Sequence, residues 1–321
     1  MLGDLVRNRL LYQAIKQSVT VDTSFLDVGA GTGVWATVAA KLGAKRVVAI
    51  EIEECLIPVI YKHAQENGVA DLIEIVHANS NDVRIRGRFD VIVSEIFGRD
   101  AISAETVRSF VHIRDHFLAR GGVLIPQKLA MLAAPVRTTH SVNDLPAALP
   151  ITAAYLQELK LGYATHLPMA ERDRVEFLAE PKKLVEIDLR TANECPLLDN
   201  LSATWKLKGL RKANAIAVFN ASTLTDNIEL DAFQSQTWGA SLMEFVPFAE
   251  KQGELEFRAT YDAAKTNWSV SLSSHPEVPT QNYGPIFSLG RIRMAQQTTP
   301  SRRFKGRKQP PIAPIPNRAP K

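Results

Sequence analysis

The stretch SFLDVGAGTGVW, residues 24–35, limits the folds open to this chain more than any other segment. An apolar run that predicts a strand is followed by glycines at Gly29, Gly31 and Gly33, and then by a helical pattern that starts at Val34. Glycine tolerates positive φ and lets the backbone come close to a ligand. A glycine-rich turn from a strand into a helix is where open α/β sheets bind nucleotides. The stretch therefore predicts an α/β domain with a ligand-binding loop.

Strand-like and helix-like segments alternate over the first third of the chain, which is typical of parallel βαβ units with right-handed crossovers. The predicted helices cover residues 1–20, Val34–Leu42, Glu54–Asn67 and Ala104–Leu118. The predicted strands cover Ser24–Val28, Arg46–Ile50, Ile73–His77, Phe89–Val93 and Val123–Ile125, with a turn at residues 120–122. The prediction is an α/β, Rossmann-like domain over residues 1–126.

The pattern changes after Pro126, where short segments of alternating apolar and polar residues replace the helices. KLVEIDL, AIAVFNASTL, ELEFRATY and WSVSLS are examples. Runs of such strands predict an antiparallel, β-barrel-like domain over residues 127–297. Residues 143–172 contain helical fragments that fit no strand pattern, and we interpret them as a helical arm inserted into this domain.

Residues 298–321 differ in composition from the rest of the chain. They are rich in proline, and residues 300–321 hold seven Lys and Arg and no acidic residue. The remaining chain has 31 basic and 34 acidic residues, so the net charge of +4 comes from this tail. A segment with so few large apolar side chains cannot bury enough surface to order itself, which predicts disorder. A basic tail of this kind suits nucleic acid or an acidic partner, and is also a common solvated extension.

Cysteine content and hydropathy exclude several classes of protein. Cys55 and Cys195 lie far apart and without metal-ligand spacing, so neither a disulfide framework nor a structural zinc site is indicated. We predict no bound metal. No apolar run approaches the roughly 18 residues that span a bilayer, and the first ten residues are too charged for a signal peptide. We therefore expect a cytoplasmic protein that does not bind membranes.

The spacing within the loop and an acidic residue downstream select among nucleotide ligands. A dinucleotide fingerprint has the spacing G-x-G-x-x-G, whereas this loop has G-x-G-x-G followed by Val34. Asp27 precedes the glycines and can meet a cation, and Glu51 ends the next strand, where a carboxylate can accept both ribose hydroxyls. An adenosine ligand with a cationic amino acid end fits these features, and we predict S-adenosylmethionine. The alternative is a tight turn with a surface glutamate.

Further motifs make the chain resemble the protein arginine methyltransferases, from Met1 to about Ser273. LDVGAGTG and VVAIE are similar to segments of most class I methyltransferases. MLGDLVRNRLL is similar to the family's Met-Leu-x-Asp-x-x-Arg segment, and VIVSEIFG is similar to its Ser-Glu-x-x-Gly loop. The order of a methyltransferase domain, a proline boundary and an all-β domain resembles this family as well.

The resemblance implies a set of cofactor-binding residues. By position, Arg7 binds the carboxylate of the cofactor, Gly29 lies against its amino acid part, and Glu51 holds the ribose. Ser80 and Asn81 correspond to a backbone contact and an acidic side chain on the adenine. Asn81 departs from the family's acid, although an amide oxygen can still accept a hydrogen bond from the exocyclic amine.

The family's catalytic element is a loop with two glutamates that clamp a guanidinium. A guanidinium is planar and always charged, so two carboxylates can fix its orientation and keep the charge on one terminal nitrogen while the other attacks the methyl group. Glu95 matches the first glutamate, and we assign Glu105 as the second. Glu105 stands ten residues on, where the family usually has nine, and Ala104 occupies the expected place. The alternative for Glu105 is an acid that only favours a helix N-terminus.

Two further departures lie outside the glutamate loop. The family's Thr-His-Trp motif is similar to Gln236, Thr237 and Trp238, and we place Trp238 at the substrate channel. Thr237 replaces a histidine that pairs in the family with an acid corresponding to Asp4, so we expect a proton relay through that pair to be lost. The family also has an aromatic-rich helix ahead of the segment that begins here at Met1. We expect either a coding start upstream or a protein that works without that helix.

The sequence therefore predicts transfer of a methyl group from S-adenosylmethionine to an arginine of a protein or peptide. The resemblance also implies a homodimer formed through the arm. Two alternatives stay open: a methyltransferase of the same build with a non-arginine substrate, and a catalytically inactive partner of an active relative. The displaced Glu105 and the histidine replaced by Thr237 are the departures that keep them open.

Overall fold

The computed structural model describes residues 1–97, 102–139, 164–167, 169–235, 237–262 and 265–283. Its first sheet is parallel, with the strand order β3-β2-β1-β4-β5. The strands are β1 (Ser24–Val28), β2 (Arg46–Glu51), β3 (Ile73–His77), β4 (Phe89–Ser94) and β5 (Leu118–Ile125). The order reverses between β1 and β4, so the sheet is doubly wound, as the sequence predicts.

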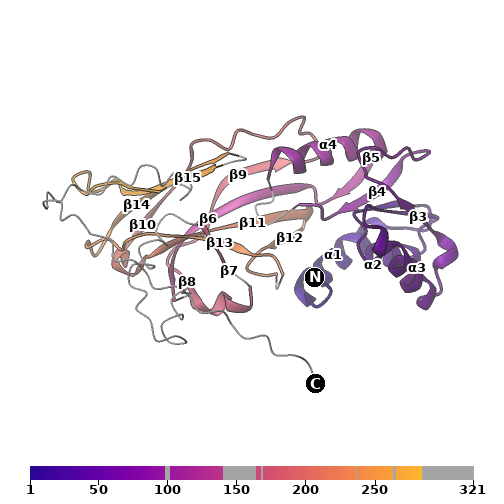
Figure 1. Cartoon of the computed structure of the whole chain (residues 1–321), viewed down its shortest axis with the longest axis horizontal. Coiled ribbons are helices and arrows are strands. Elements are labelled where there is room, and N and C mark those ends of the chain that lie inside the picture. Colours follow the sequence, from indigo (N-terminus) through magenta and orange to yellow (C-terminus); the bar gives the residue numbers. More distant parts are fainter. Residues whose placement is uncertain (98–101, 140–163, 168, 236, 263–264, 284–321) are drawn as a thin grey trace, which may run out of the picture. The chain divides into compact units, whose positions relative to one another are not determined.

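Helices cover both faces of this sheet (Figure 1). They are α1 (Leu5–Ser18), α2 (Val34–Lys41), α3 (Ile57–Glu66) and α4 (Ala104–Phe117), with short 3-10 turns η1 (Glu54–Leu56) and η2 (Ala70–Leu72). Successive strand residues point to opposite faces. In β2, Val47 and Ala49 pack in a core with α1, α2 and α3, whereas Val48 and Ile50 pack with α4. Continuous apolar strands are therefore buried on both sides.

The predicted helices and strands of this half are confirmed, with two corrections. The helix predicted at Glu54–Asn67 begins as the 3-10 turn η1 and becomes α-helical at Ile57, with Pro58 in its first turn. The predicted turn at residues 120–122 lies inside β5. The pairing with β4 jumps from Leu118 to Val123, and Gly121 takes a φ of 76°. The glycines thus form a bulge within the strand and do not separate it from the helix.

After the cis peptide bond between Ile125 and Pro126, the pairing becomes antiparallel. One sheet has the order β7-β13-β11-β6-β8, with β12 added to β11 and β9 added to β6. Its strands are β6 (Lys128–Thr138), β7 (Ala164–Leu167), β8 (Val175–Phe177), β9 (Lys182–Asp188), β11 (Ala215–Thr225), β12 (Ile228–Asp231) and β13 (Ala240–Glu244). The other sheet, β10-β14-β15-β16, comprises β10 (Leu201–Leu207), β14 (Gly253–Asp262), β15 (Lys265–Leu272) and β16 (Gln281–Tyr283). The predicted antiparallel half is confirmed.

The predicted arm and tail are only partly described. Residues 143–163 of the arm and the whole tail, residues 298–321, lie outside the described residues. The prediction that this segment contains no strand is wrong at its end, because Ala164–Leu167 form β7 and pair with β13. Residues 169–174 then form the 3-10 turn η4. Four residues at a sheet edge are too short to show an alternating pattern, which is why the sequence did not reveal this strand.

Helix α1 joins the two halves of the core. Leu11 and Ile15 are fully buried in one apolar cluster with Ala36 of α2 and with Leu230 and Ala232 of the antiparallel half.

A second cluster fills the space between the two antiparallel sheets, with Trp205, Phe257 and Trp268 among its largest side chains. No helix in the described ranges is long and apolar enough to cross a membrane.

Replacing Gly33 by alanine is expected to destabilise the fold more than the same change at Gly31. Both glycines have positive φ, 73° and 58°, which costs an alanine about 1–2 kcal/mol. A Cβ at Gly33 would also lie 2.6 Å from Cγ2 of Ile60, whereas nothing lies within 4 Å of one at Gly31. We expect Gly33→Ala to lose about 1–3 kcal/mol beyond the loss in Gly31→Ala, measured by urea unfolding. Equal losses would contradict the contact with α3.

Candidate active site

Three acidic residues gather where the central parallel strands end. Asp27 lies near the end of β1, Glu51 ends β2, and Glu95 follows β4. Because β1 lies between β2 and β4, this edge is the switch point at which doubly wound sheets bind ligands. The loop after β1 is tied to β2, since the N–H groups of Gly29 and Ala30 both donate to the carbonyl of Ile50 at 2.9 Å.

The carboxylate of Glu51 is held by backbone N–H groups. One oxygen accepts from Gly31 at 2.6 Å, and the other accepts from Ile52 at 2.9 Å and from Glu53 at 3.0 Å. The side chain belongs to a buried residue, so these bonds replace the water that it gives up. The carboxyl group of Glu51 is thus held in place next to the glycine loop.

Asp27 is buried beneath the same loop. One carboxylate oxygen accepts from the N–H of Ala36, in the first turn of α2, at 3.0 Å. Burial, together with the nearby charges of Glu95 and Glu51, raises the pKa of Asp27 to about 7, and the hydrogen bond from Ala36 offsets part of that rise. A carboxyl group in this environment is stabilised in its ionised form when a cation lies beside it.

Glu95 binds a guanidinium of the protein itself. Its carboxylate accepts from Nε of Arg7 at 2.7 Å and from Nη2 of Arg7, and Nε1 of Trp35 donates to it at 3.2 Å. The side chains of Arg7 and Glu95 are 5% and 11% exposed. Burial raises the pKa of Glu95, and the guanidinium of Arg7 opposes part of that rise. The carboxylate is therefore shaped and positioned to accept a fork of two N–H donors.

Arg7 is positioned through Asp4, the N-cap of α1. One oxygen of Asp4 accepts from the N–H of Arg7 at 3.0 Å. The other accepts from the hydroxyl of Ser235 at 2.6 Å and from the N–H and hydroxyl of Thr237 at 3.1 and 2.9 Å. The link between Asp4 and position 237 is thus present with a hydroxyl in place of an imidazole. A threonine hydroxyl does not titrate near neutral pH, so this link carries no proton relay.

The antiparallel half also contacts the loop after β4. The rings of Trp238 and Phe97 meet edge to face, with centroids 5.3 Å apart and an interplanar angle of 77°. Trp238 is buried, and Phe97 stands two residues after Glu95. Trp238 therefore supports the backbone that carries Glu95. Residues 98–101 of this loop and Gln236 of the Thr-His-Trp-like motif lie outside the described part of the chain.

The remaining predicted residues lie at different places. Ser80 and Asn81 follow β3, the strand next to β2, and the amide of Asn81 donates to Ser109 of α4 at 3.5 Å. Glu105 lies in the first turn of α4, behind the N-cap Ser103. It is exposed and makes no hydrogen bond or ion pair with the described residues. The structure therefore brings together Arg7, Asp27, Glu51 and Glu95, and does not join Glu105 to Glu95.

Sequence reasoning missed two residues of this site. Trp35 follows the glycine loop by two residues. A tryptophan so close to a predicted ligand loop could have been recognised as a candidate site residue. Ser235 has no signal of its own, because its partner Asp4 lies 231 positions away. No group of three or more His, Cys, Asp or Glu side chains suited to a metal ion occurs among the residues with described positions.

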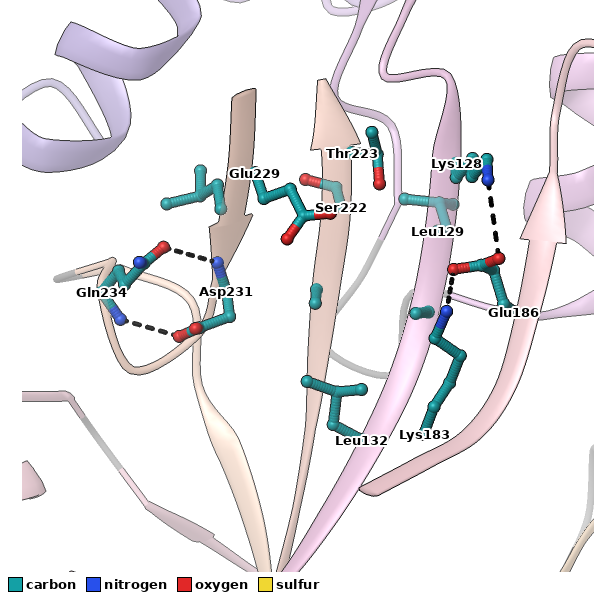
Figure 2. Close-up of a pocket in the computed structure, with 13 residues that line it drawn as sticks. Lys128, Leu129, Leu132, Lys183, Glu186, Ser222, Thr223, Glu229, Asp231 and Gln234 are labelled. Carbon is teal, nitrogen blue, oxygen red and sulfur yellow. Dashed lines mark hydrogen bonds and ion pairs between the residues drawn. The ribbon is translucent and has the colours of Figure 1, made fainter. Parts of the chain in front are cut away.

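A cavity of about 240 Å³ lies elsewhere, over β6, β11 and β12, as Figure 2 shows. Its two lysines, Lys128 and Lys183, both pair with Glu186. Asp231 accepts from the N–H groups of Phe233 and Gln234. Most of the charged groups are thus already paired with one another. None of the predicted site residues lines this cavity.

The stability of the protein is expected to fall as pH rises from about 4 to 7 because of Asp27. The folded state holds a proton on Asp27 up to a pKa of about 7, whereas the unfolded chain loses it near 3.8. One such group contributes a slope of up to about 1.4 kcal/mol per pH unit in this window. Urea unfolding of the protein and of Asp27→Asn from pH 4.5 to 7.5 tests this. The difference in unfolding free energy should shrink with rising pH, and a constant difference would contradict it.

The chain is similar in sequence to known methyltransferases. A family model described as Ribosomal protein L11 methyltransferase (PrmA) matches residues 8–131. A probable protein arginine N-methyltransferase 6 of Arabidopsis thaliana is 28% identical over 220 residues, which cover 66% of this chain and 50% of that protein. Protein arginine N-methyltransferase 1 of Saccharomyces cerevisiae is 28% identical over 204 residues, 60% of this chain and 56% of that protein. The chain spans about half the length of the curated relatives it matches.

Solved structures share the fold over most of the chain. A Trypanosoma brucei PRMT1 enzyme-prozyme heterotetrameric complex with AdoHcy gives a TM-score of 0.70 at 18% identity, covering 88% of this chain and 96% of that one. Arabidopsis thaliana protein arginine methyltransferase 10 gives 0.69 at 18% identity, covering 88% and 95%. With the glycine loop, the switch-point carboxylates and the antiparallel half, these matches show that the chain is similar in sequence to protein arginine methyltransferases and shares their fold.

Proposed function

We propose that this chain transfers the methyl group of S-adenosylmethionine to a guanidino nitrogen of an arginine in a protein or peptide. The observation that carries the proposal is the contact between Glu95 and Arg7, in which a carboxylate at the switch point takes a guanidinium in fork geometry. A carboxylate that binds an internal arginine this way has the shape and charge to bind an arginine of a substrate. The relatives named above are arginine methyltransferases.

The charges at the site suit S-adenosylmethionine. Three acidic residues, Asp27, Glu51 and Glu95, lie at this edge of the sheet, and Glu95 pairs with one buried cation, Arg7. S-Adenosylmethionine carries two positive charges, on its sulfonium and ammonium groups, and one carboxylate, so its net charge complements the site. We assign Glu51 to the ribose hydroxyls, Asp27 and the loop glycines Gly29, Gly31 and Gly33 to the amino acid end, and the Ser80–Asn81 segment to the adenine.

The protein's contribution to the transfer is binding and orientation. When bound, S-adenosylmethionine supplies a methyl group that its sulfonium already activates. Glu95 holds the acceptor guanidinium and keeps its charge on the nitrogens that face the carboxylate, so the other terminal nitrogen has a lone pair available. Trp35 fixes the carboxylate of Glu95, and Trp238 supports its loop through Phe97. Orientation of this kind supplies most of the acceleration when the donor is already reactive.

Glu105 remains the predicted second carboxylate of the clamp. It lies at the start of the helix that follows the glutamate loop, and its exposed side chain is free to turn toward an arriving cation. The same exposure, together with Thr237 in place of the family's histidine, favours a second candidate function, a partner that binds cofactor without turnover. A methyl-transfer assay separates the two functions.

Self-association through the arm stays a prediction. The Trypanosoma brucei structure is a heterotetrameric complex of enzyme and prozyme, and we propose a homodimer for this chain on the family resemblance. Most of the predicted arm, residues 143–163, lies outside the described residues. Sedimentation of the whole chain, with and without deletion of these residues, tests the assignment.

Glu95→Gln should lower methyl transfer to an arginine-rich peptide on the order of 100-fold, because a neutral amide cannot hold the guanidinium charge. The readout is incorporation of label from S-adenosylmethionine. Glu105→Gln should also lower transfer if it forms the clamp, and Glu66→Gln, an exposed glutamate of α3, serves as the matched control. Wild-type label no greater than that of Glu95→Gln, with cofactor bound in both, would reject the arginine function and leave the non-catalytic partner.

Glu51→Ala should weaken S-adenosylmethionine binding by about 1–3 kcal/mol, because two ribose hydroxyls lose a charged acceptor. Isothermal titration calorimetry measures this directly. Glu53→Ala, two residues along and exposed, is the control and should bind as the wild type does. Unchanged affinity in Glu51→Ala would show that the ribose binds elsewhere.

A further inference from the structure

The buried pair of Arg7 and Glu95 joins two residues to which the proposed function gives different ligands. Glu95 is assigned to the substrate guanidinium, and Arg7 to the carboxylate of the cofactor. In the structure, both carboxylate oxygens of Glu95 accept hydrogen bonds from Arg7. Nε1 of Trp35 donates a further hydrogen bond to one of these oxygens. The two oxygens of a carboxylate can accept two parallel hydrogen bonds from one guanidinium at a time. A substrate arginine therefore has to displace Arg7 before it can bind Glu95 with two hydrogen bonds.

Arg7 in turn needs an anion wherever its guanidinium goes. Its side chain is 5% exposed, and it is the one buried cation in the described ranges. A buried charge without a partner is strongly destabilising. The amide oxygen of Asn8, which accepts from Nη1 at 2.7 Å, is neutral and cannot replace a carboxylate. Displacement of Arg7 from Glu95 is therefore unfavourable unless another anion arrives.

We propose that Arg7 exchanges partners, moving from Glu95 to the carboxylate of the amino acid end of the cofactor, and that this exchange frees Glu95 for the substrate arginine. This inference rests on the proposed function. It makes Arg7 a positioning residue that couples the two binding sites. By linkage, each ligand then raises the affinity of the protein for the other by the same factor.

The backbone of Arg7 is fixed, so the exchange is a movement of one side chain. Asp4 holds the N–H of Arg7, and Ser235 and Thr237 hold Asp4. The ring of Trp35 lies 6.0 Å from the guanidinium carbon of Arg7, close enough to attract the cation through its face. No change in the packing of α1 is needed for the coupling.

Binding of a fluorescent glycine-arginine peptide to the whole chain tests the coupling without turnover. S-Adenosylhomocysteine carries the carboxylate, whereas 5′-methylthioadenosine has the adenosine and thioether but no amino acid end. At saturation, we expect the first to raise peptide affinity about tenfold or more and the second to leave it unchanged. Equal effects of the two ligands would overturn the proposal.

Arg7→Gln removes the internal competitor for Glu95. Without any nucleoside, this variant should bind the peptide about tenfold more tightly than the wild type, and S-adenosylhomocysteine should no longer add to that affinity. Arg9→Gln, an exposed arginine on the same helix, is the matched control and should behave as the wild type does. No gain in Arg7→Gln, with its thermal unfolding unchanged, would overturn the proposal.

A spectroscopic measurement separates this proposal from the proposed function. The Nε–H signal of Arg7, assigned by its loss in Arg7→Lys, should shift in nitrogen-15 NMR spectra when S-adenosylhomocysteine binds, and should not shift with 5′-methylthioadenosine. A stationary signal in a protein that still methylates peptides overturns the exchange and leaves the function. A signal that shifts in a protein that neither binds nor methylates arginine peptides rejects the arginine substrate and retains the movement of Arg7 toward the cofactor.

Discussion

The removal of acidic side chains from water is the constraint on which the rest of this site depends. Asp27, Glu51 and Glu95 meet at the ends of β1, β2 and β4, where water is largely excluded. The protein compensates each one differently. Glu51 accepts hydrogen bonds from three backbone N–H groups. Glu95 accepts hydrogen bonds from the guanidinium of Arg7. Asp27 accepts a hydrogen bond from one backbone N–H group, and its pKa stays raised. Such an arrangement has a high affinity for added positive charge.

The position of α1 follows from this constraint. The helix brings the one buried cation to Glu95, and its N-cap ties that cation to the antiparallel half through Ser235 and Thr237. Trp238, one residue further on, packs on Phe97 beside the same loop. Helix α1 and the segment that begins at Ser235 thereby support the one carboxylate that the proposed function requires, although Asp4 and Ser235 lie 231 positions apart. The replacement of histidine by Thr237 keeps this support and removes a titrating group.

The parts of the fold that the sequence predicted are those with strong local patterns. The buried parallel strands are continuous apolar runs, and α4 begins at a serine cap with Glu105 in its first turn. The errors are in short or irregular segments. The four-residue strand β7 depends on pairing with β13, and the bulge at Gly121 depends on the register against β4. Such pairing is a long-range property that a local pattern does not record.

For the site, the sequence alone predicted the glycine loop and the acidic strand ends, and it carried the resemblance to protein arginine methyltransferases. These features are local, because the glycine spacing and the residue that ends a strand are read within a few positions. Only the tertiary structure decided that Arg7 and Glu95, 88 positions apart, bind each other, and that Glu105 faces solvent. The physical reason is that a buried charge takes the nearest opposite charge in space. Which charge that is depends on how α1, β4 and the antiparallel half pack together.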